Sequence, residues 1–90
     1  MYPLEVEQTL ERHPAVREAA VIGIPDRRWG EVVHGFVVPD DLSAPPDPEE
    51  LRQFARASLA GFKVPTAWTF VAELPRNANG KLLRRQLVSS

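Results

Sequence analysis

The sequence predicts a small α+β domain in which helices pack on a sheet of about three strands. Three apolar segments rich in β-branched or aromatic residues have the composition of strands, and two other segments begin with a proline beside acidic residues, as helices do. Segments of both kinds are interspersed along the chain, which favours helices layered on one sheet. With 90 residues, 43% of them hydrophobic, the chain has enough apolar material for one core and too little for two domains.

The first element is a helix predicted from about Pro3 to Arg12. Proline suits the first helical turn, where its missing N–H is not needed, and the acidic residues after it lie near the positive end of the helix dipole. Pro14 disfavours helical geometry at His13 and therefore ends the helix.

Two strands are predicted next. Residues 16–24 form an apolar, partly β-branched run that indicates a strand covered on both faces, and Pro25 with Asp26 then turns the chain. Residues 31–38 have the pattern of a second strand, one face of which carries Val32, His34, Phe36 and Val38. The proline-rich stretch 39–48 is typical of a solvated connector.

A second helix is predicted after this connector. Asp47 suits an N-cap, Pro48 the first helical position and Glu50 the reciprocal partner of a capping box. Gly61 is a natural stop. Between these points, helical spacing is kept by Leu51, Phe54, Ala55, Ser58 and Leu59.

The last part of the chain is predicted as a strand at 67–72, a loop at 75–81 and a short helix at 82–88. After Glu73 it has four basic residues and no acidic one: Arg76, Lys81, Arg84 and Arg85. Any anion that the domain meets is therefore expected at this local basic patch.

The overall composition argues against several classes of protein. The 11 basic and 12 acidic residues give a net charge of -1, so no overall field attracts nucleic acid or an anionic membrane. The sequence contains no cysteine, no apolar run long enough to span a bilayer and no signal-peptide pattern. We therefore expect a cytoplasmic domain without membrane or nucleic-acid partners.

The loop 75–81 contains the residue best suited to chemistry. Two asparagines and Gly80 make the loop polar and prone to turn, so that the Lys81 ammonium points outward. Such a compact charge suits a carboxylate or phosphate oxygen on which negative charge is building. The loop is not a phosphate-binding P-loop, because it lacks the earlier glycine and Leu82 replaces the hydroxyl residue. Taken alone, a lysine beside a glycine is most often only solvated.

Five motifs occur in order along nearly all of the chain. They are Tyr2-Pro3-Leu4-Glu5-Val6-Glu7, residues 13–16 with 18–23, Asp26 with Trp29-Gly30-Glu31, Phe62-Lys63-Val64-Pro65, and residues 75–85. Together they resemble the C-terminal domain of the acyl-CoA synthetase and adenylation-domain (ANL) superfamily. The fourth motif and the ending 83–88 are particularly similar to aryl-CoA ligases of the halobenzoate type.

The resemblance implies that the chain is the lid in a two-step reaction. In this superfamily a carboxylate attacks the α-phosphate of ATP to give acyl-AMP and pyrophosphate, and the thiol of CoA then displaces AMP. The small domain rotates on a hinge between the steps, and the lysine of the Gly-Lys motif, here Lys81, reaches the carboxylate and the nucleotide in the first pose only. ATP and CoA are thus the implied substrates. Mg²⁺ is expected to be held mainly by a large N-terminal adenylation domain, which lies outside residues 1–90.

The resemblance also implies a CoA-binding face. In the aryl-ligase branch, an aromatic residue of the Asp-x-x-Trp-Gly-Glu loop and the phenylalanine of Phe-Lys-x-Pro flank the adenine of CoA. These residues are Trp29 and Phe62 here, although either could instead belong to the core. The basic residues expected near the CoA phosphates are replaced by Val64 and Thr66, which leaves Lys63 and nearby arginines for that contact.

Other interpretations are open for the same residues. His34 lies on an apolar strand face and His13 is the residue that precedes the proline in this family, so both fit structural roles. No pair of acids and histidines has metal-ligand spacing. Arg84 and Arg85 fit a solvated helix face or a phosphate contact. The whole chain could be a piece of a synthetase, a free-standing subunit that docks on a separate adenylation domain, or the lid of an enzyme that loads a carrier protein. A module that binds RNA or polyphosphate is a further alternative, but the basic patch lacks the interleaved aromatic residues that favour such binding.

Overall fold

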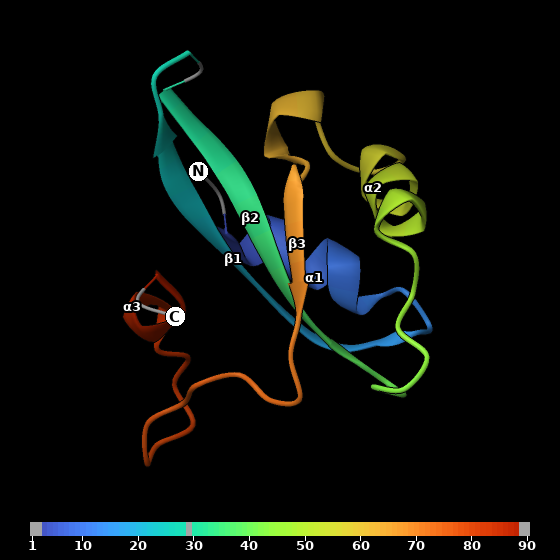
Figure 1. Ribbon diagram of the computed structural model, residues 1–90, viewed down its shortest axis with the longest axis vertical. Coiled ribbons are helices and arrows are strands. Elements are labelled where there is room, and N and C mark those ends of the chain that lie inside the picture. Colours follow the sequence, from blue (N-terminus) through green and yellow to red (C-terminus); the bar gives the residue numbers. More distant parts are fainter. Residues whose placement is uncertain (1–2, 29, 89–90) are drawn as a thin grey trace.

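The fold is a sheet with helices on its faces, which confirms the predicted α+β class (Figure 1). The computed structural model describes residues 3–28 and 30–88, with Phe62 and Val88 described by their backbone alone. In chain order the elements are α1 (Pro3–Glu11), β1 (Val16–Asp26), β2 (Gly30–Pro39), α2 (Pro48–Arg56), the short 3-10 helix η1 (Gly61–Lys63), β3 (Ala67–Phe70) and α3 (Arg84–Val88).

The sheet is mixed, and its strands lie in the order β1-β2-β3. β1 and β2 form an antiparallel hairpin that is longer than predicted, because Pro25 pairs with Glu31 and Asp26 with Gly30. Proline is tolerated there because β1 is an edge strand. β3 joins β2 in parallel after the chain crosses over through α2 and η1. It ends at Phe70, two residues before the predicted end.

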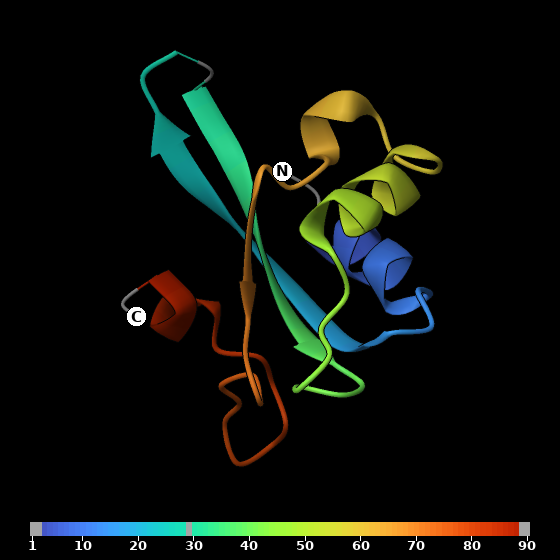
Figure 2. The same ribbon diagram turned by 45° about the vertical axis from the view of Figure 1, so that its right-hand side comes forward.

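Different parts of the chain cover the two faces of the sheet. α1 and α2 pack on one face, and the segment from the end of β3 to α3 lies on the other (Figure 1, Figure 2). The first face buries Val6, Leu10, Val16, Ala19, Val21, Val33, Val37, Leu51, Ala55, Leu59 and Val64. The second face buries Ala20, Ile22, Phe36, Val38, Leu74 and Leu87. Both faces of β1 are thus covered, as the apolar run predicts.

α2 begins where the sequence predicts. The side chain of Asp47 accepts a hydrogen bond from the N–H of Glu49 at 2.8 Å, which confirms Asp47 as the N-cap. The predicted role of Glu50 in a capping box is wrong: its Oε1 lies 3.2 Å from His13 Nε2, so Glu50 connects α2 to the end of α1. The helix ends at Arg56, before the predicted stop.

α3 begins later than predicted, at Arg84 and not at Leu82. Leu82 pairs with Arg76 across the preceding loop, and the N–H of Leu83 donates to the carbonyl of Pro75 at 2.9 Å. These contacts close the loop and prevent its last residues from joining the helix. The apolar residues Leu82 and Leu87 of this segment pack on the second face of the sheet.

Candidate functional site

The loop between β3 and α3 is closed around Asn77. The side-chain oxygen of Asn77 accepts hydrogen bonds from the N–H groups of Asn79 and Lys81, each at 2.9 Å. The Asn77 N–H donates to the Lys81 carbonyl at 3.0 Å, and the Asn77 carbonyl accepts from the N–H of Gly80 at 2.9 Å. Gly80 has a φ of +82°, in the left-handed region that favours glycine. The backbone that carries Lys81 is therefore fixed by hydrogen bonds within the loop.

The Lys81 side chain is exposed on this loop, as the composition of the segment predicts. Among the residues that the structure describes, no hydrogen bond or ion pair engages its ammonium group, whereas its backbone N–H and carbonyl are both bonded. A fixed backbone with a mobile ammonium lets a compact positive charge reach an anion over the length of one side chain.

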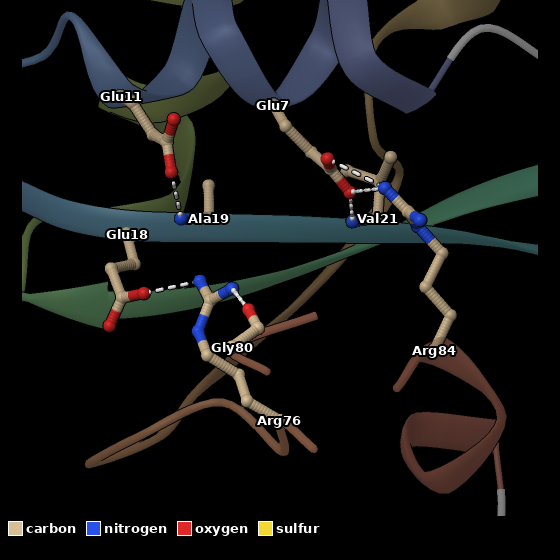
Figure 3. Close-up of polar contacts among 8 residues, drawn as sticks. All are labelled: Glu7, Glu11, Glu18, Ala19, Val21, Arg76, Gly80 and Arg84. Atoms are coloured by element: carbon tan, nitrogen blue, oxygen red, sulfur yellow. Dashed lines mark hydrogen bonds and ion pairs between the residues drawn. The ribbon is translucent and has the colours of Figure 1, made fainter. Parts of the chain in front are cut away.

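Two arginines fasten the ends of the loop to the rest of the domain (Figure 3). Arg76 donates from Nη1 to the carbonyl of Gly80 at 3.0 Å and from Nη2 to Glu18 Oε1 on β1. Arg84, at the start of α3, donates from Nη2 to both carboxylate oxygens of Glu7, at 2.7 and 2.8 Å. Arg84 is thus engaged within the domain. Sequence reasoning missed both pairs, because their members lie 58 and 77 positions apart in the sequence.

Two glutamates of α1 accept hydrogen bonds from backbone N–H groups on the outer edge of β1 (Figure 3). Glu7 Oε2 accepts a hydrogen bond from the N–H of Val21 at 2.9 Å, and Glu11 Oε2 accepts one from the N–H of Ala19 at 3.1 Å. The two glutamates are one helical turn apart on α1, and the two N–H groups are two residues apart on β1 and face the same way. α1 therefore runs alongside the edge of β1. Two edge donors of β1 are in this way paired without another strand.

The turn between β1 and β2 lies at the other end of the molecule from the Lys81 loop, and η1 lies in the same half as that turn (Figure 1, Figure 2). In the turn, Asp26 Oδ1 accepts a hydrogen bond from the N–H of Arg28 at 2.8 Å. Trp29 falls outside the described residues, and of Phe62 only the backbone, within η1, is described. The structure therefore separates the segments that carry Trp29 and Phe62 from Lys81.

Lys63 is engaged with α1. Its Nζ lies 2.9 Å from Glu5 Oε2, which joins η1 to the first helix. Val64, the next residue, is only 6% exposed and belongs to the core of the first face. Thr66 donates its N–H to the carbonyl of Val33 at 2.8 Å. Position 64 in this chain is therefore a core position.

The histidines have the structural environments that the sequence suggests. His13 is buried; its Nδ1 accepts from the N–H of Ala15 at 3.0 Å, and its Nε2 contacts α2. His34 Nε2 lies 2.8 Å from Thr69 Oγ1, and its ring stacks on Phe36 with the ring centres 4.4 Å apart. Burial lowers the pKa of His34 below its ordinary value.

A groove of about 810 Å³ runs beside His34 on the second face of the sheet. Its walls are mostly apolar residues of β1, β2 and the segment after β3, and its polar lining residues are His34, Thr69, Glu73 and Gln86. The sequence has no local signal for this groove, because its walls come from segments far apart along the chain.

The described residues bring together no group of three or more His, Asp or Glu side chains that could hold a metal ion. They therefore offer no all-protein cage for Mg²⁺. In the same part of the chain, no helix is long and apolar enough to cross a membrane.

A small α+β domain with a Gly-Lys loop at one end is the arrangement expected of the C-terminal domain of an adenylate-forming enzyme. The chain belongs to this class: residues 5–81 match the family described as "AMP-binding enzyme C-terminal domain". The family predicted from the motifs is therefore confirmed. The matched range includes all the candidate site residues, from Trp29 to Lys81.

Relatives of this chain carry a similar segment within much longer proteins. The chain is 50% identical over 90 residues to the "Fatty acid--[acyl-carrier-protein] ligase ScoC" of Streptomyces coeruleorubidus. The aligned region covers 97% of the chain and 17% of that protein. It is 49% identical over 87 residues to a "2-succinylbenzoate--CoA ligase" of Bacillus licheniformis, covering 97% of the chain and 18% of that protein. The chain thus spans less than a fifth of the length of these relatives.

Solved structures agree with this relationship. The amide bond synthetase McbA from Marinactinospora thermotolerans matches with a TM-score of 0.92 and 40% identity, over 99% of the chain and 18% of that protein. The o-succinylbenzoate CoA synthetase MenE from Bacillus subtilis, in complex with the acyl-adenylate intermediate OSB-AMP, matches with a TM-score of 0.90 and 44% identity, over 97% of the chain and 17% of that protein.

Proposed function

We propose that this chain is the mobile C-terminal domain of an ATP-dependent, AMP-forming carboxylate–CoA ligase of the cytoplasm. It supplies Lys81 to the adenylation step and part of the CoA site to the thioester step. A large adenylation domain, in the same polypeptide or in a separate one, provides the sites for the acid and ATP and most contacts to Mg²⁺. The observation that carries the proposal is the exposed ammonium of Lys81 on a hydrogen-bonded loop, in a chain of this family.

Lys81 is suited to the first half-reaction because adenylation brings two anions together. A carboxylate must approach the α-phosphate of ATP, and negative charge builds at the phosphorus as the new bond forms. An ammonium that bridges the carboxylate and the nucleotide reduces the repulsion and stabilises the transition state. The loop is pre-organised for this task because its backbone hydrogen bonds are already formed.

The second half-reaction uses the other end of the domain. Trp29 and Phe62 flank the adenine of CoA, and Lys63 turns from Glu5 to a CoA phosphate. The domain measures 34 × 26 × 20 Å, and its two candidate ends lie far apart along the longest direction (Figure 1). One orientation cannot present both ends to a single reaction centre, which supports a rotation between the steps.

The test of Lys81 is a pair of single-turnover measurements on the assembled ligase, that is, the chain together with its adenylation domain. Lys81→Ala should slow the formation of acyl-AMP from acid and ATP about a hundred- to a thousandfold, the usual cost of losing one transition-state donor. Synthetic acyl-AMP should still be converted to thioester at close to the normal rate. Arginine should rescue poorly, because its planar fork replaces a compact ammonium badly.

Arg56→Ala is the matched control, since Arg56 is an exposed cation in the last turn of α2. Its removal should leave both half-reactions unchanged. Equal slowing of both half-reactions by Lys81→Ala would mean damage to the fold or to domain docking, and an unchanged first half-reaction would show that Lys81 is only a surface lysine.

The CoA face is tested separately. Trp29→Ala or Phe62→Ala in the assembled ligase should raise the KM for CoA while adenylation continues at its normal rate. Stacking on a base contributes about 1–3 kcal/mol, so each loss should be roughly five- to a hundredfold. A KM for CoA that stays the same in both variants would assign these residues to other roles.

A carrier protein is the second candidate for the acceptor. The relative from Streptomyces coeruleorubidus is named as a ligase for an acyl-carrier protein and is 50% identical to this chain. Phosphopantetheine on a carrier protein offers the same thiol as CoA but lacks the adenine. Rates of thioester formation from acyl-AMP, measured with CoA and with a loaded carrier protein, decide between the two acceptors.

A further inference from the structure

The side chain of Arg76 ties the Lys81 loop to the sheet, because it contacts both. Arg76 donates from Nη2 to Glu18 on β1 and from Nη1 to the carbonyl of Gly80 at 3.0 Å (Figure 3). Gly80 directly precedes Lys81, so the guanidinium of Arg76 holds the peptide unit from which Lys81 extends. Arginine suits this task because its donors point in fixed directions from a planar group.

The contact acts on a loop whose shape is stabilised by its own hydrogen bonds. Asn77 binds the N–H groups of Asn79 and Lys81, and the carbonyl of Lys81 accepts from the N–H of Asn77. These bonds fix the shape of the loop but not its direction relative to the sheet. The direction depends on the contacts that the loop makes with the sheet: the Arg76–Glu18 ion pair joins its first residues to β1, and Leu82 packs on the core of the second face.

The other end of the segment is fixed as well. Arg84 begins α3 and pairs with Glu7, which also accepts a hydrogen bond from the N–H of Val21 on β1. The segment between the two arginines is thus attached at both ends (Figure 3). At its first attachment, the Arg76 and Glu18 side chains are 39% and 33% exposed. An ion pair so accessible to water adds little to global stability, so its loss should leave the fold intact.

We propose that Arg76 is a positioning residue for the adenylation step: by bridging Glu18 and the carbonyl of Gly80, it holds the loop at the angle at which Lys81 meets the reacting anions. The inference rests on the function proposed above for Lys81. It assigns no contact with substrate to Arg76 itself. A displacement of about 1 Å at a reacting group can cost a hundredfold in rate, so a contact of little value for stability can still control the reaction.

The experiment compares both half-reactions in the assembled ligase for Arg76→Met, Arg76→Lys and Glu18→Gln. Arg76→Met should slow the formation of acyl-AMP about ten- to a hundredfold and leave the conversion of supplied acyl-AMP to thioester unchanged. Arg76→Lys should recover part of the lost rate, because it retains the charge but cannot donate to two acceptors so well. Glu18→Gln should slow the same step by less than Arg76→Met, since the bond to Gly80 survives.

Arg17→Met is the matched control. Arg17 precedes Glu18 on β1 and forms an exposed ion pair with Asp40, away from the loop. Its loss should leave both half-reactions unchanged. In a Lys81→Ala background, Arg76→Met should add no further slowing, because both changes remove the same delivered charge.

The outcomes separate this inference from the proposed function. If Lys81→Ala slows adenylation and Arg76→Met does not, the inference is overturned and the proposed function stands. Slowing of both half-reactions by Arg76→Met, or additive slowing in the double variant, also overturns it, because either result indicates a general structural role. If Lys81→Ala is without effect, the proposed function fails, and the positioning role fails with it.

Discussion

His34 is a residue whose environment makes the stability of the domain depend on pH. It lies on β2 between Phe36, on which it stacks, and Thr69, to which it is hydrogen-bonded. Burial disfavours its charged form and lowers its pKa below the value of 6.5 that it has when unfolded. As the pH falls through 6.5, the unfolded chain therefore binds a proton that the folded chain does not. The free energy of unfolding decreases until the pH reaches the folded pKa of His34, and below that pKa the His34 contribution stays at its lower level.

We therefore expect the free energy of unfolding to fall less steeply in His34→Gln than in the wild-type chain between pH 7.5 and pH 5. Urea unfolding at a series of pH values measures both slopes. The variant loses the ring stack and should be less stable at every pH, so the comparison uses slopes and not absolute values. His13 is present in both proteins and does not affect the difference. Parallel pH profiles would contradict the prediction.

For the candidate site residues, the sequence alone predicted the exposure of Lys81 but not which residues contact one another. The Asn-rich loop with Gly80 predicted an outward-pointing Lys81, because turn residues act locally. The partners of Arg76, Lys63 and Arg84 could not be predicted, since each pair joins residues at least 58 positions apart. The separation of Lys81 from the segments of Trp29 and Phe62 is likewise a result of the whole fold.

At the scale of elements, the beginnings of α1 and α2 were predicted better than the ends of the hairpin strands or the beginning of α3. α1 and α2 begin at Pro3 and Pro48 as expected, because a proline and its neighbouring cap are local signals. The hairpin strands extend past the turn predicted at Pro25, and α3 begins after the predicted start, because pairing with distant residues decides both boundaries. Local patterns contain no information about such partners.

α1 offers a test of how a helix can complete the edge of a sheet. Glu7 and Glu11 each accept an N–H of β1, but their surroundings differ. Glu7 is buried and also pairs with Arg84, whereas Glu11 is exposed. Loss of Glu7 leaves a buried N–H and an arginine without their partner, and water cannot readily replace it.

Glu7→Ala should lower the free energy of unfolding by about 2–3 kcal/mol, the cost of an unsatisfied buried donor together with a lost charged hydrogen bond. Glu11→Ala is the matched control one turn further along the helix, and it should cost about 1 kcal/mol or less because water can take its place. Denaturant unfolding of both variants provides the values. Equal losses in the two variants would show that the edge bonds, and not the burial of Glu7, determine the effect.

The whole molecule has apolar cores on both faces of one thin sheet, and its candidate chemistry lies at the ends. α1 and α2 cover one face and the C-terminal segment covers the other, so the sheet is the shared wall of both cores. The Lys81 loop is therefore attached to the second core through Leu74 and Leu87, which flank it in sequence. A domain whose two cores share one sheet can move as a single body, as the proposed lid role requires.

The isolated chain should fold but should not release pyrophosphate from ATP in the presence of any carboxylic acid. The groove of about 810 Å³ on its second face is within the size range of ligand pockets. None of the described residues that line this groove is a lysine or an arginine, and Glu73 adds a negative charge, so the groove is unsuited to a triphosphate. Lys81, the cation proposed for adenylation, is not among the lining residues.

The measurement is pyrophosphate release by the purified chain with Mg²⁺, ATP and a panel of carboxylic acids, after circular dichroism has shown that the chain unfolds cooperatively. The expected rate equals that of a blank without protein, and a complete 2-succinylbenzoate–CoA ligase serves as the positive control. Lys81→Ala in the same 90-residue chain distinguishes true turnover from contamination. Release that exceeds the blank and disappears in Lys81→Ala would mean that the chain holds nucleotide and acid by itself, and that the adenylation site does not depend on a second domain.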